Sequence, residues 1–254
     1  MLRLITIPIS HYCEKARWAL DRAGIAYREE RHIQGVHMIA ARRAGGGITT
    51  PVLVMPDRVL AESADIVEWA DGHNPPSLRL FPAERDEVDA LCRRFDEKLG
   101  PHGRRLMYVN VLKDKEFVFS FNNAGVPRWE DRFIRAGWPL VLRFAKRRLD
   151  IRPGIEKLDE RVVREEFDYA AELLADGRPY LCGETFTAAD LTFAALAAAM
   201  VVPPEYTVQL PQPEDEDVPP EPRELIEQFR EHPAGQHALA MFRQHRRERA
   251  AVPG

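Results

Sequence analysis

The order of strand and helix patterns in residues 1–72 constrains the fold more than any other feature of this sequence. Short runs of aliphatic and β-branched residues alternate there with segments of helical periodicity. Strands joined through a helix pair in parallel, whereas strands joined by a tight turn pair antiparallel. The pattern therefore predicts a small mixed sheet with helices packed on it. The expected strands are Leu2–Ile7, Tyr27–Ile33, Pro51–Met55 and Val59–Ala61, and the expected helices are Tyr12–Ala23, Val36–Arg43 and Ser63–Gly72.

The chain changes character after this region. His73-Asn74-Pro75-Pro76 has the composition of a linker, and clear strand alternation nearly disappears beyond it. We therefore predict an α/β domain at residues 1–76 and an all-helical domain at residues 83–254. Helical patterns lie at about Glu84–Leu99, within Asp131–Leu149, and at Leu158–Leu174, Ala188–Val202 and Arg223–Arg247.

Two segments interrupt the helical half. Residues 101–130 contain Phe117-Val118-Phe119-Ser120-Phe121, whose alternating aromatics fit either a strand or the packing of a long connection between helices. Residues 203–222 carry seven prolines around the acidic run Glu214–Asp217, which predicts a solvated loop that contributes nothing to a core. The basic run Arg246-Arg247-Glu248-Arg249 is typical of a solvated helix end.

Composition and charge exclude several classes of function. The chain has 36 Lys and Arg against 40 Asp and Glu, a formal charge of −4, so it lacks a global positive field to hold nucleic acid. Its longest mostly apolar run, Leu191–Val202, is shorter than the roughly 18 residues that cross a bilayer, and Met1 leads directly into a strand pattern. We therefore expect no membrane partner, no cleaved signal and a cytoplasmic location.

The cysteines indicate the same compartment. Cys13, Cys92 and Cys182 are odd in number and far apart, which suits neither a disulfide framework nor paired zinc ligands. We expect free thiols in a reducing compartment and no bound metal.

The first candidate site lies at the junction of the first strand and the first helix, in Ser10-His11-Tyr12-Cys13-Glu14-Lys15-Ala16-Arg17. A helix start presents unpaired N–H groups and the positive end of the helix dipole, which together favour an anion such as a thiolate by about 0.3–1 kcal/mol. In one interpretation the Ser10 hydroxyl donates a hydrogen bond to a substrate thiolate. In the other, Ser10 is only the N-cap of the helix.

This string resembles the active-site start of the glutathione transferases, a family with a thioredoxin-like N-terminal domain followed by an all-helical domain. Ser10-x-x-Cys13 stands where thioredoxin and glutaredoxin relatives have Cys-x-x-Cys, and Glu14–Leu20 is similar to the family's basic-x-Arg-x-x-Leu helix. Thr50-Pro51-Val52-Leu53 resembles the family's cis-proline strand, and Glu62-Ser63-Ala64-Asp65-Ile66 resembles its Glu-Ser-x-x-Ile turn. The three motifs follow one another in the family's order.

The resemblance implies a thioredoxin-like mixed-sheet domain, a helical-bundle domain and glutathione as the co-substrate. Ser10 would stabilise the glutathione thiolate, and Thr50 and Pro51 would align the tripeptide as an added strand. Glu62 and Ser63 would hold its γ-glutamyl end, which carries an ammonium and a carboxylate. The thiolate would add to a small hydrophobic electrophile against the helical domain, and the protein would be a homodimer.

Each motif also has a purely structural interpretation. Pro51 can simply open an edge strand, where proline is tolerated, and Ser63 can simply cap the helix that follows. Thr187-Ala188-Ala189-Asp190 has the capping-box pattern of a long core helix, and we give it no catalytic role.

The remaining candidates are the neighbours of Ser10. We favour a Cys13 that packs under the first helix over a redox-active thiol. His11 stands where relatives commonly carry proline, and we expect a solvent-facing imidazole. Tyr12 either hydrogen-bonds a ligand or packs on the second domain.

Two other classes of function stay open. The first is a binding protein that keeps this fold without turnover, because Ile48-Thr49 offers no lysine or similar polar contact where family members often place one before the proline. The second is a Cys13-dependent glutathione thiol oxidoreductase, which would require a reactive Cys13.

Overall fold

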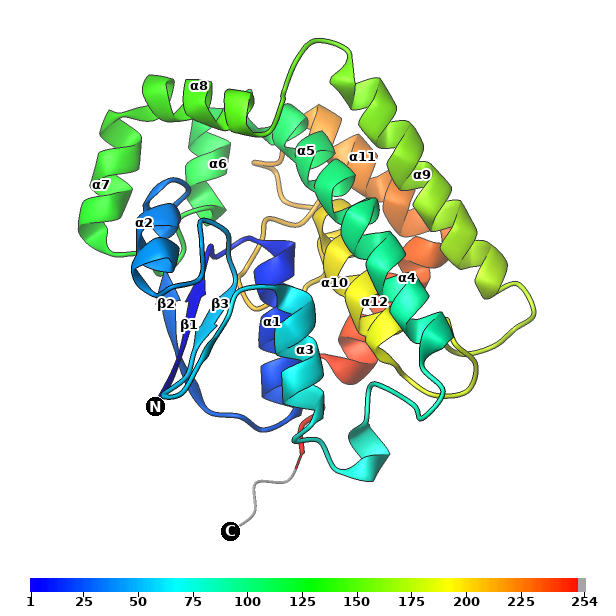
Figure 1. Ribbon diagram of the computed structural model, residues 1–254. Helices are drawn as coiled ribbons and strands as arrows, with labels where there is room; N and C mark the ends of the chain where they lie inside the picture. Colours follow the sequence, from blue (N-terminus) through cyan, green and yellow to red (C-terminus); the bar gives the residue numbers. More distant parts are fainter. Residues whose placement is uncertain (251–254) are drawn as a thin grey trace.

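The computed structural model describes residues 1–250, in which a sheet and its helices are followed by a large helical region (Figure 1). The first part contains β1 (Leu2–Thr6), α1 (His11–Arg22), β2 (Tyr27–Arg31), α2 (Val36–Arg43), β3 (Val52–Val54), β4 (Val59–Leu60) and α3 (Ser63–Asp71). The second contains the short 3-10 helix η1 (Pro76–Leu78), α4 (Asp86–Glu97), α5 (Leu99–Val111), α6 (Lys115–Phe121), α7 (Arg128–Ala136), α8 (Trp138–Arg148), α9 (Ile155–Leu173), α10 (Ala188–Val201), α11 (Pro220–Glu231) and α12 (Pro233–His245). The fold class predicted from the sequence is confirmed.

The four strands form one mixed sheet in the order β2-β1-β3-β4. β1 pairs with β2 in parallel and with β3 antiparallel, and β3 and β4 form an antiparallel hairpin. The helix between β1 and β2 and the short turn between β3 and β4 produce these two pairings, as the sequence predicted.

Helices cover both faces of the sheet, because neighbouring residues of β1 point to opposite sides. Leu4 belongs to the main core together with Ala16 and Ala19 of α1, whereas Ile5 packs with Ala41 of α2. In Figure 1, α1 and α3 lie side by side on one face and α2 lies on the other. Burial on both faces explains why the sequence of β1 is mostly apolar rather than strictly alternating.

Helix α10 is the centre of the helical region, and nearly all of its residues are buried. It contacts α1, α4, α5, α11 and α12. The predicted capping box is present at its start, where the Thr187 N–H donates to the Asp190 carboxylate at 3.0 Å. Although α10 is strongly apolar, none of the helices in residues 1–250 combines the length and hydrophobicity of a membrane span.

Residues 101–130 form helices and not a strand. Asp114 caps α6 by accepting the Phe117 N–H at 2.9 Å, which starts a new helix after α5. Phe117 and Phe121 then meet one turn apart, with ring centroids 5.2 Å apart. Phe117 and Phe119 belong to different apolar clusters. The alternation of aromatic residues therefore reflects a short helix that is packed on two sides.

The single helix predicted at Arg223–Arg247 is two helices, α11 and α12, which meet at His232 and Pro233. Pro233 has no N–H to continue α11, and it restricts His232 to an extended backbone with φ −65° and ψ 138°. The apolar periodicity continues through this break, which is why it suggested one helix.

The prediction that residues 203–222 form a solvated loop outside the core is wrong for much of the segment. Tyr206 is buried in the main core and Val218 in a smaller apolar cluster. The Tyr206 hydroxyl donates to the Ile9 carbonyl at 3.0 Å. Prolines restrict the backbone, but they do not stop the large side chains between them from packing. The acidic run Glu214–Asp217 is exposed, as predicted.

The interpretation of Arg246 as part of a solvated helix end is also wrong. Its side chain is buried and donates to Glu14 at 2.7 Å and to Asp21 at 3.0 Å, both on α1. Glu14 is fully buried and also pairs with Arg17 at 3.2 Å. The segment around Arg246 therefore lies against the first helix, which no local pattern reveals.

Candidate functional site

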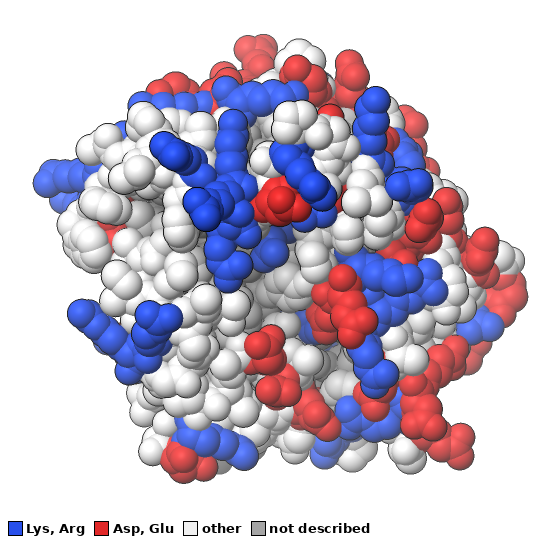
Figure 2. Space-filling model, turned by 45° about the horizontal axis from the view of Figure 1, so that its top comes forward, with Lys and Arg blue, Asp and Glu red and all other residues white. Residues whose placement is uncertain are grey.

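A cavity of about 320 Å³ lies where the sheet part meets the helical part. Its walls come from the loop between β1 and α1, the start of α2, the residues before β3, helices α5, α6 and α8, and the segment around Leu210. On the face that carries α8, Figure 2 shows Lys and Arg side chains gathered around a hollow. The cavity lining is mostly apolar with a few polar side chains, which is the usual character of a small-molecule site.

Ser10 lines the cavity and is the N-cap of α1. Its backbone is extended, and its Oγ accepts the Cys13 N–H at 3.4 Å. A hydroxyl that accepts one hydrogen bond still has its own proton to donate. The two interpretations of Ser10, helix cap and donor to a thiolate, are therefore compatible.

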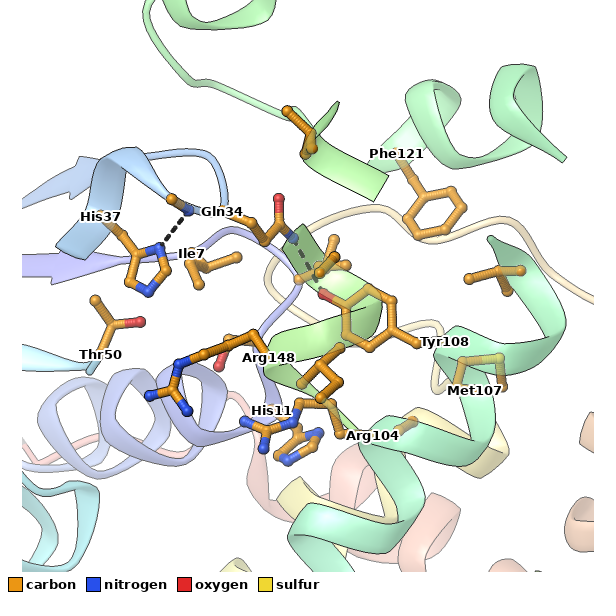
Figure 3. Close-up of a pocket in the computed structure, with 18 of the residues that line it drawn as sticks. Ile7, His11, Gln34, His37, Thr50, Arg104, Met107, Tyr108, Phe121 and Arg148 are labelled. Carbon is orange, nitrogen blue, oxygen red and sulfur yellow. Dashed lines mark hydrogen bonds between the residues drawn. The ribbon is translucent and has the colours of Figure 1, made fainter. Parts of the chain in front are cut away.

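Thr50 reaches the same cavity from the start of β3 (Figure 3). The Thr50–Pro51 peptide bond is cis, and Pro51 itself is buried and does not line the cavity. Thr50 and Ser10 thus line one cavity, which brings the first two motifs of the sequence together.

The third motif lies at the N-terminus of α3, outside the cavity lining. Glu62 is the N-cap residue and is exposed, whereas Ser63 is the first residue of the helix and is buried. The structural alternative for Ser63, an N-cap of α3, differs from the structure by one position, because the N-cap is Glu62 and the helix already begins at Ser63. Neither residue of this motif belongs to the cavity lining that Ser10 and Thr50 share.

Cys13 was expected to pack half-buried under the first helix, and it is fully buried there. Burial raises the pKa of its thiol, against the opposing influence of the Arg17 charge and of hydrogen bonds from Ser10 and Thr50. A protonated and enclosed thiol is a poor nucleophile, because the thiolate is the reactive form. The geometry therefore favours a packing role for Cys13.

The expectation of a solvent-facing His11 is wrong. Its side chain is only 4% exposed and lines the cavity, next to Arg104 of α5 (Figure 3). Burial, reinforced by the charges of Arg104 and Lys15, lowers its pKa to about 3, so the imidazole is neutral at physiological pH. Next to it, Tyr12 packs on the helical part and donates its hydroxyl proton to the Asp96 carbonyl at 2.8 Å.

Several cavity residues belong to no sequence motif, as Figure 3 shows for Gln34, His37, Arg104, Tyr108 and Arg148. The Gln34 side-chain amide donates to the Tyr108 hydroxyl at 3.1 Å, which links the segment after β2 to α5. Arg104 and Tyr108 are four residues apart and share a face of α5. That spacing is the one local signal that could have grouped them.

An apolar wall of the cavity comes from α6 and α8, through Phe117, Phe121, Val141 and Phe144. In Figure 1, α6, α7 and α8 lie over α2. The fully buried Glu130 of α7 holds this region to the sheet part, since its carboxylate accepts the Ile33 N–H at 2.9 Å and contacts the His32 ring at 2.7 Å. The position of the apolar wall therefore depends on a buried polar clamp.

The side chains around the cavity suit the binding of anions. They include a hydroxyl at a helix N-terminus, a neutral imidazole and the guanidinium groups of Arg104 and Arg148. In residues 1–250 no three His, Cys, Asp or Glu side chains are grouped as metal ligands would be. The arrangement can therefore stabilise a thiolate or a carboxylate beside apolar walls.

Comparisons with known proteins agree with this architecture. Residues 4–77 match the family model of the glutathione S-transferase N-terminal domain. No curated protein sequence matches the chain.

Solved structures are similar to nearly the whole chain. Glutathione transferase GSTFuA2 from Phanerochaete chrysosporium has a TM-score of 0.63 at 18% identity, over 98% of this chain and 99% of that one. A glutathione S-transferase from Methylobacillus flagellatus KT, solved with glutathione bound, has a TM-score of 0.61 at 15% identity, over 99% and 100%. The β-etherase LigF from Sphingobium sp. strain SYK-6 has a TM-score of 0.57 at 16% identity, over 94% and 98%. Residues 4–77 thus form a glutathione S-transferase N-terminal domain, in a chain that has the glutathione S-transferase fold.

Proposed function

We propose that the protein is a glutathione transferase, with glutathione as its co-substrate, that adds the glutathione thiolate to a small hydrophobic electrophile. The observation that carries this proposal is that Ser10, at the N-terminus of α1, and Thr50, before the cis bond to Pro51, line one cavity. The similarity of the fold to a transferase with glutathione bound supports it.

The glutathione sulfur would lie at the Ser10 hydroxyl. A hydrogen bond from Ser10 and the exposed N–H groups of α1 both favour the thiolate over the thiol. Each unit by which they lower the thiol pKa corresponds to about 1.4 kcal/mol of preference for the thiolate. The catalytic role of Ser10 would therefore be to keep more of the bound glutathione in its nucleophilic form at neutral pH.

The peptide backbone of glutathione would pair with Thr50 as an added strand next to β3. Its γ-glutamyl end would extend to α3, where Ser63 and the first N–H groups bind the carboxylate and Glu62 binds the ammonium. This end would lie at the edge of the cavity, since Glu62 is exposed and neither residue belongs to the lining.

Helix α8 supplies the cation that the sequence lacks before Pro51. Arg148 lines the cavity, and its charge contributes to the environment of His37, whose pKa burial lowers to about 4. We assign the glycyl carboxylate of glutathione to Arg148. The absence of a polar residue at Ile48 then no longer favours a protein without turnover.

In this proposal the two parts of the chain bind different substrates. Residues 1–76 would form the glutathione-binding domain, and residues 83–254 would supply the wall for the electrophile through α5, α6 and α8. The three free cysteines accord with a reducing cytoplasm. Light scattering on the purified protein would test the proposed homodimer.

The test of the proposal combines calorimetric titration with glutathione and a pH titration of thiolate absorbance in the complex. We expect binding, and a bound thiol with a pKa about one unit or more below its free value, near 8.5. Ser10→Ala should raise the pKa of the bound thiol most of the way back to its free value while the protein stays folded. Ser120→Ala is the matched control, because Ser120 is exposed on α6 and lies outside the cavity lining.

The outcome separates the open alternatives. A folded Ser10→Ala variant that binds glutathione with an unchanged thiolate titration would remove Ser10 from the mechanism. Glutathione binding without any lowered pKa or turnover would favour the non-catalytic binding protein. The oxidoreductase alternative has little support, because Cys13 is enclosed and its thiol pKa is raised by burial.

A further inference from the structure

Two arginines line the cavity without a partner of opposite charge. In residues 1–250 the side chains of Arg104 and Arg148 take part in no ion pair or hydrogen bond, and the lining contains no Asp or Glu. The Nε of Arg104 is buried and has no hydrogen-bond partner. A buried N–H group of a cation is costly to leave unpaired, so this position is suited to receive an anion.

His11 presents a second unpaired group at the same place. Its side chain is only 4% exposed, and its Nε2 has no hydrogen-bond partner in residues 1–250. The Arg104 charge acts directly on His11, and Figure 3 shows the two side chains next to each other. Because the imidazole is neutral, its N–H can donate to an anion that Arg104 attracts.

The rest of α5 shows what lies beyond this anion position. Arg104, Met107, Tyr108 and Val111 all line the cavity, and their spacing places them along one face of the helix. From Arg104 to Val111 this face extends for about 10 Å, at about 1.5 Å per residue. A ligand lying along it would meet a cation at one end and apolar side chains at the other.

We propose that this cavity binds an apolar organic acid, with its carboxylate on Arg104 and His11 and its body along Met107 and Val111. This inference rests on the proposed function, in which the acid is the second substrate, and narrows the electrophile to a carboxylated one. Arg148 is assigned to glutathione, so each arginine serves a different ligand.

The reaction class is nucleophilic substitution on such an acid, with para-chloro-meta-nitrobenzoate as the probe. The glutathione thiolate forms a carbon–sulfur bond at the ring carbon that carries chlorine, the carbon–chlorine bond breaks and chloride leaves with the electron pair. The thiol proton goes to solvent. The corresponding benzamide has the same shape and leaving group without the negative charge.

The first measurement is binding without turnover. Protein saturated with glutathione is titrated with para-methyl-meta-nitrobenzoate, which has no leaving group, and with its benzamide. We expect the wild-type protein to bind the benzoate about ten-fold more tightly, a difference of about 1.4 kcal/mol. Equal affinities in the wild-type protein would overturn the inference without any variant.

The second measurement locates the preference. Arg104→Gln should remove the preference for the benzoate by lowering the affinity for the benzoate alone. Arg161→Gln should keep the preference, because Arg161 is exposed on α9 and is not part of the cavity. Equal weakening of both probes in Arg104→Gln would overturn the inference. So would a loss of the preference in Arg148→Gln but not in Arg104→Gln, or a changed thiolate pKa in Arg104→Gln.

The kinetic probes separate this inference from the proposed function. If both the chlorinated benzoate and the chlorinated benzamide are turned over, and Arg104→Gln slows the two reactions equally, the acid preference is refuted. The proposed transferase activity would then still stand. Arg104-dependent binding of the benzoate without turnover of either probe would support the binding site and refute the transferase.

Discussion

Replacing Asp190 with alanine should destabilise the helical core by much more than the loss of an ordinary helix cap. The Asp190 carboxylate is fully buried and accepts the Leu181 N–H at 2.8 Å, the Thr187 N–H at 3.0 Å and the Thr187 hydroxyl at 2.9 Å. Alanine would leave both N–H groups buried without an acceptor, at about 1–3 kcal/mol each. The variant also no longer buries a carboxylate charge, which offsets part of this cost. The ring of His237 lies 3.4 Å from that carboxylate. We expect a net loss of about 3–4 kcal/mol in the free energy of unfolding.

Asp114→Ala is the matched control. Asp114 caps α6 through one N–H, that of Phe117 at 2.9 Å, and it is exposed to solvent. Water can replace its carboxylate, so the expected loss is about 1 kcal/mol. Both variants remove an aspartate from a helix start, the N-cap of α6 at Asp114 and the N3 position of the α10 capping box at Asp190. Their difference therefore measures what the burial of the carboxylate and its additional hydrogen bonds contribute.

The assay is urea unfolding followed by the fluorescence of tryptophan, since Trp18 is fully buried in the main core. With a slope of about 3 kcal/mol per molar urea, the midpoint should fall by about 1 M for Asp190→Ala and about 0.3 M for Asp114→Ala. Equal midpoints for the two variants would refute the reasoning from burial. A normal midpoint with weakened glutathione binding would show that Asp190 acts at the ligand site instead.

Two further predictions concern buried groups on α1. Arg246→Met should lower the free energy of unfolding by about 3 kcal/mol at pH 7, because it leaves the buried Glu14 carboxylate short of a partner, whereas Arg247→Met should have little effect since Arg247 is exposed. Burial alone would raise the pKa of Glu14, but Arg246 and Arg17 outweigh it and hold this pKa below its usual 4.5. The stabilisation that the ionised Glu14 carboxylate gives to the folded protein is therefore complete above pH 4.5. It is lost as the pH falls through the lowered pKa of Glu14. Urea unfolding at pH 7 and near pH 3 should show the cost of Arg246→Met shrinking in acid, and a cost that is independent of pH would contradict this pairing. Cys13→Ser should leave transferase turnover and glutathione affinity largely unchanged, because the thiol is enclosed and protonated. Loss of turnover in a folded Cys13→Ser protein would revive the oxidoreductase.

Local sequence was sufficient for the parts of this fold that depend on neighbouring residues. The mixed sheet follows from the lengths of its connections, and the capping box at Thr187 and Asp190 follows from two side chains three positions apart. Ser10 at the start of α1 and Thr50 before Pro51 are likewise local features. Both residues line the same cavity, although they are 40 positions apart in the sequence.

Local sequence failed where short segments meet distant ones. The aromatic run at Phe117–Phe121 alternates like a strand, yet packing on two sides and the cap at Asp114 make it a helix. The proline-rich segment has the composition of a solvated loop, yet Tyr206 packs in the main core. Its hydroxyl donates a hydrogen bond to the distant Ile9 carbonyl. In both segments tertiary packing outweighed local propensity.

The character of the cavity was decided by tertiary structure alone. His11 is buried although it stands at the start of a helix, and Arg104 of α5, which lies next to it, is far away in the sequence. Glu14 finds its charge partner in Arg246, 232 positions away. Hydrophobic periodicity and helix caps act over about four residues, so they determine where strands and helices form. The burial and pairing of a charge depend on which elements come to lie around it, and only the folded chain decides that.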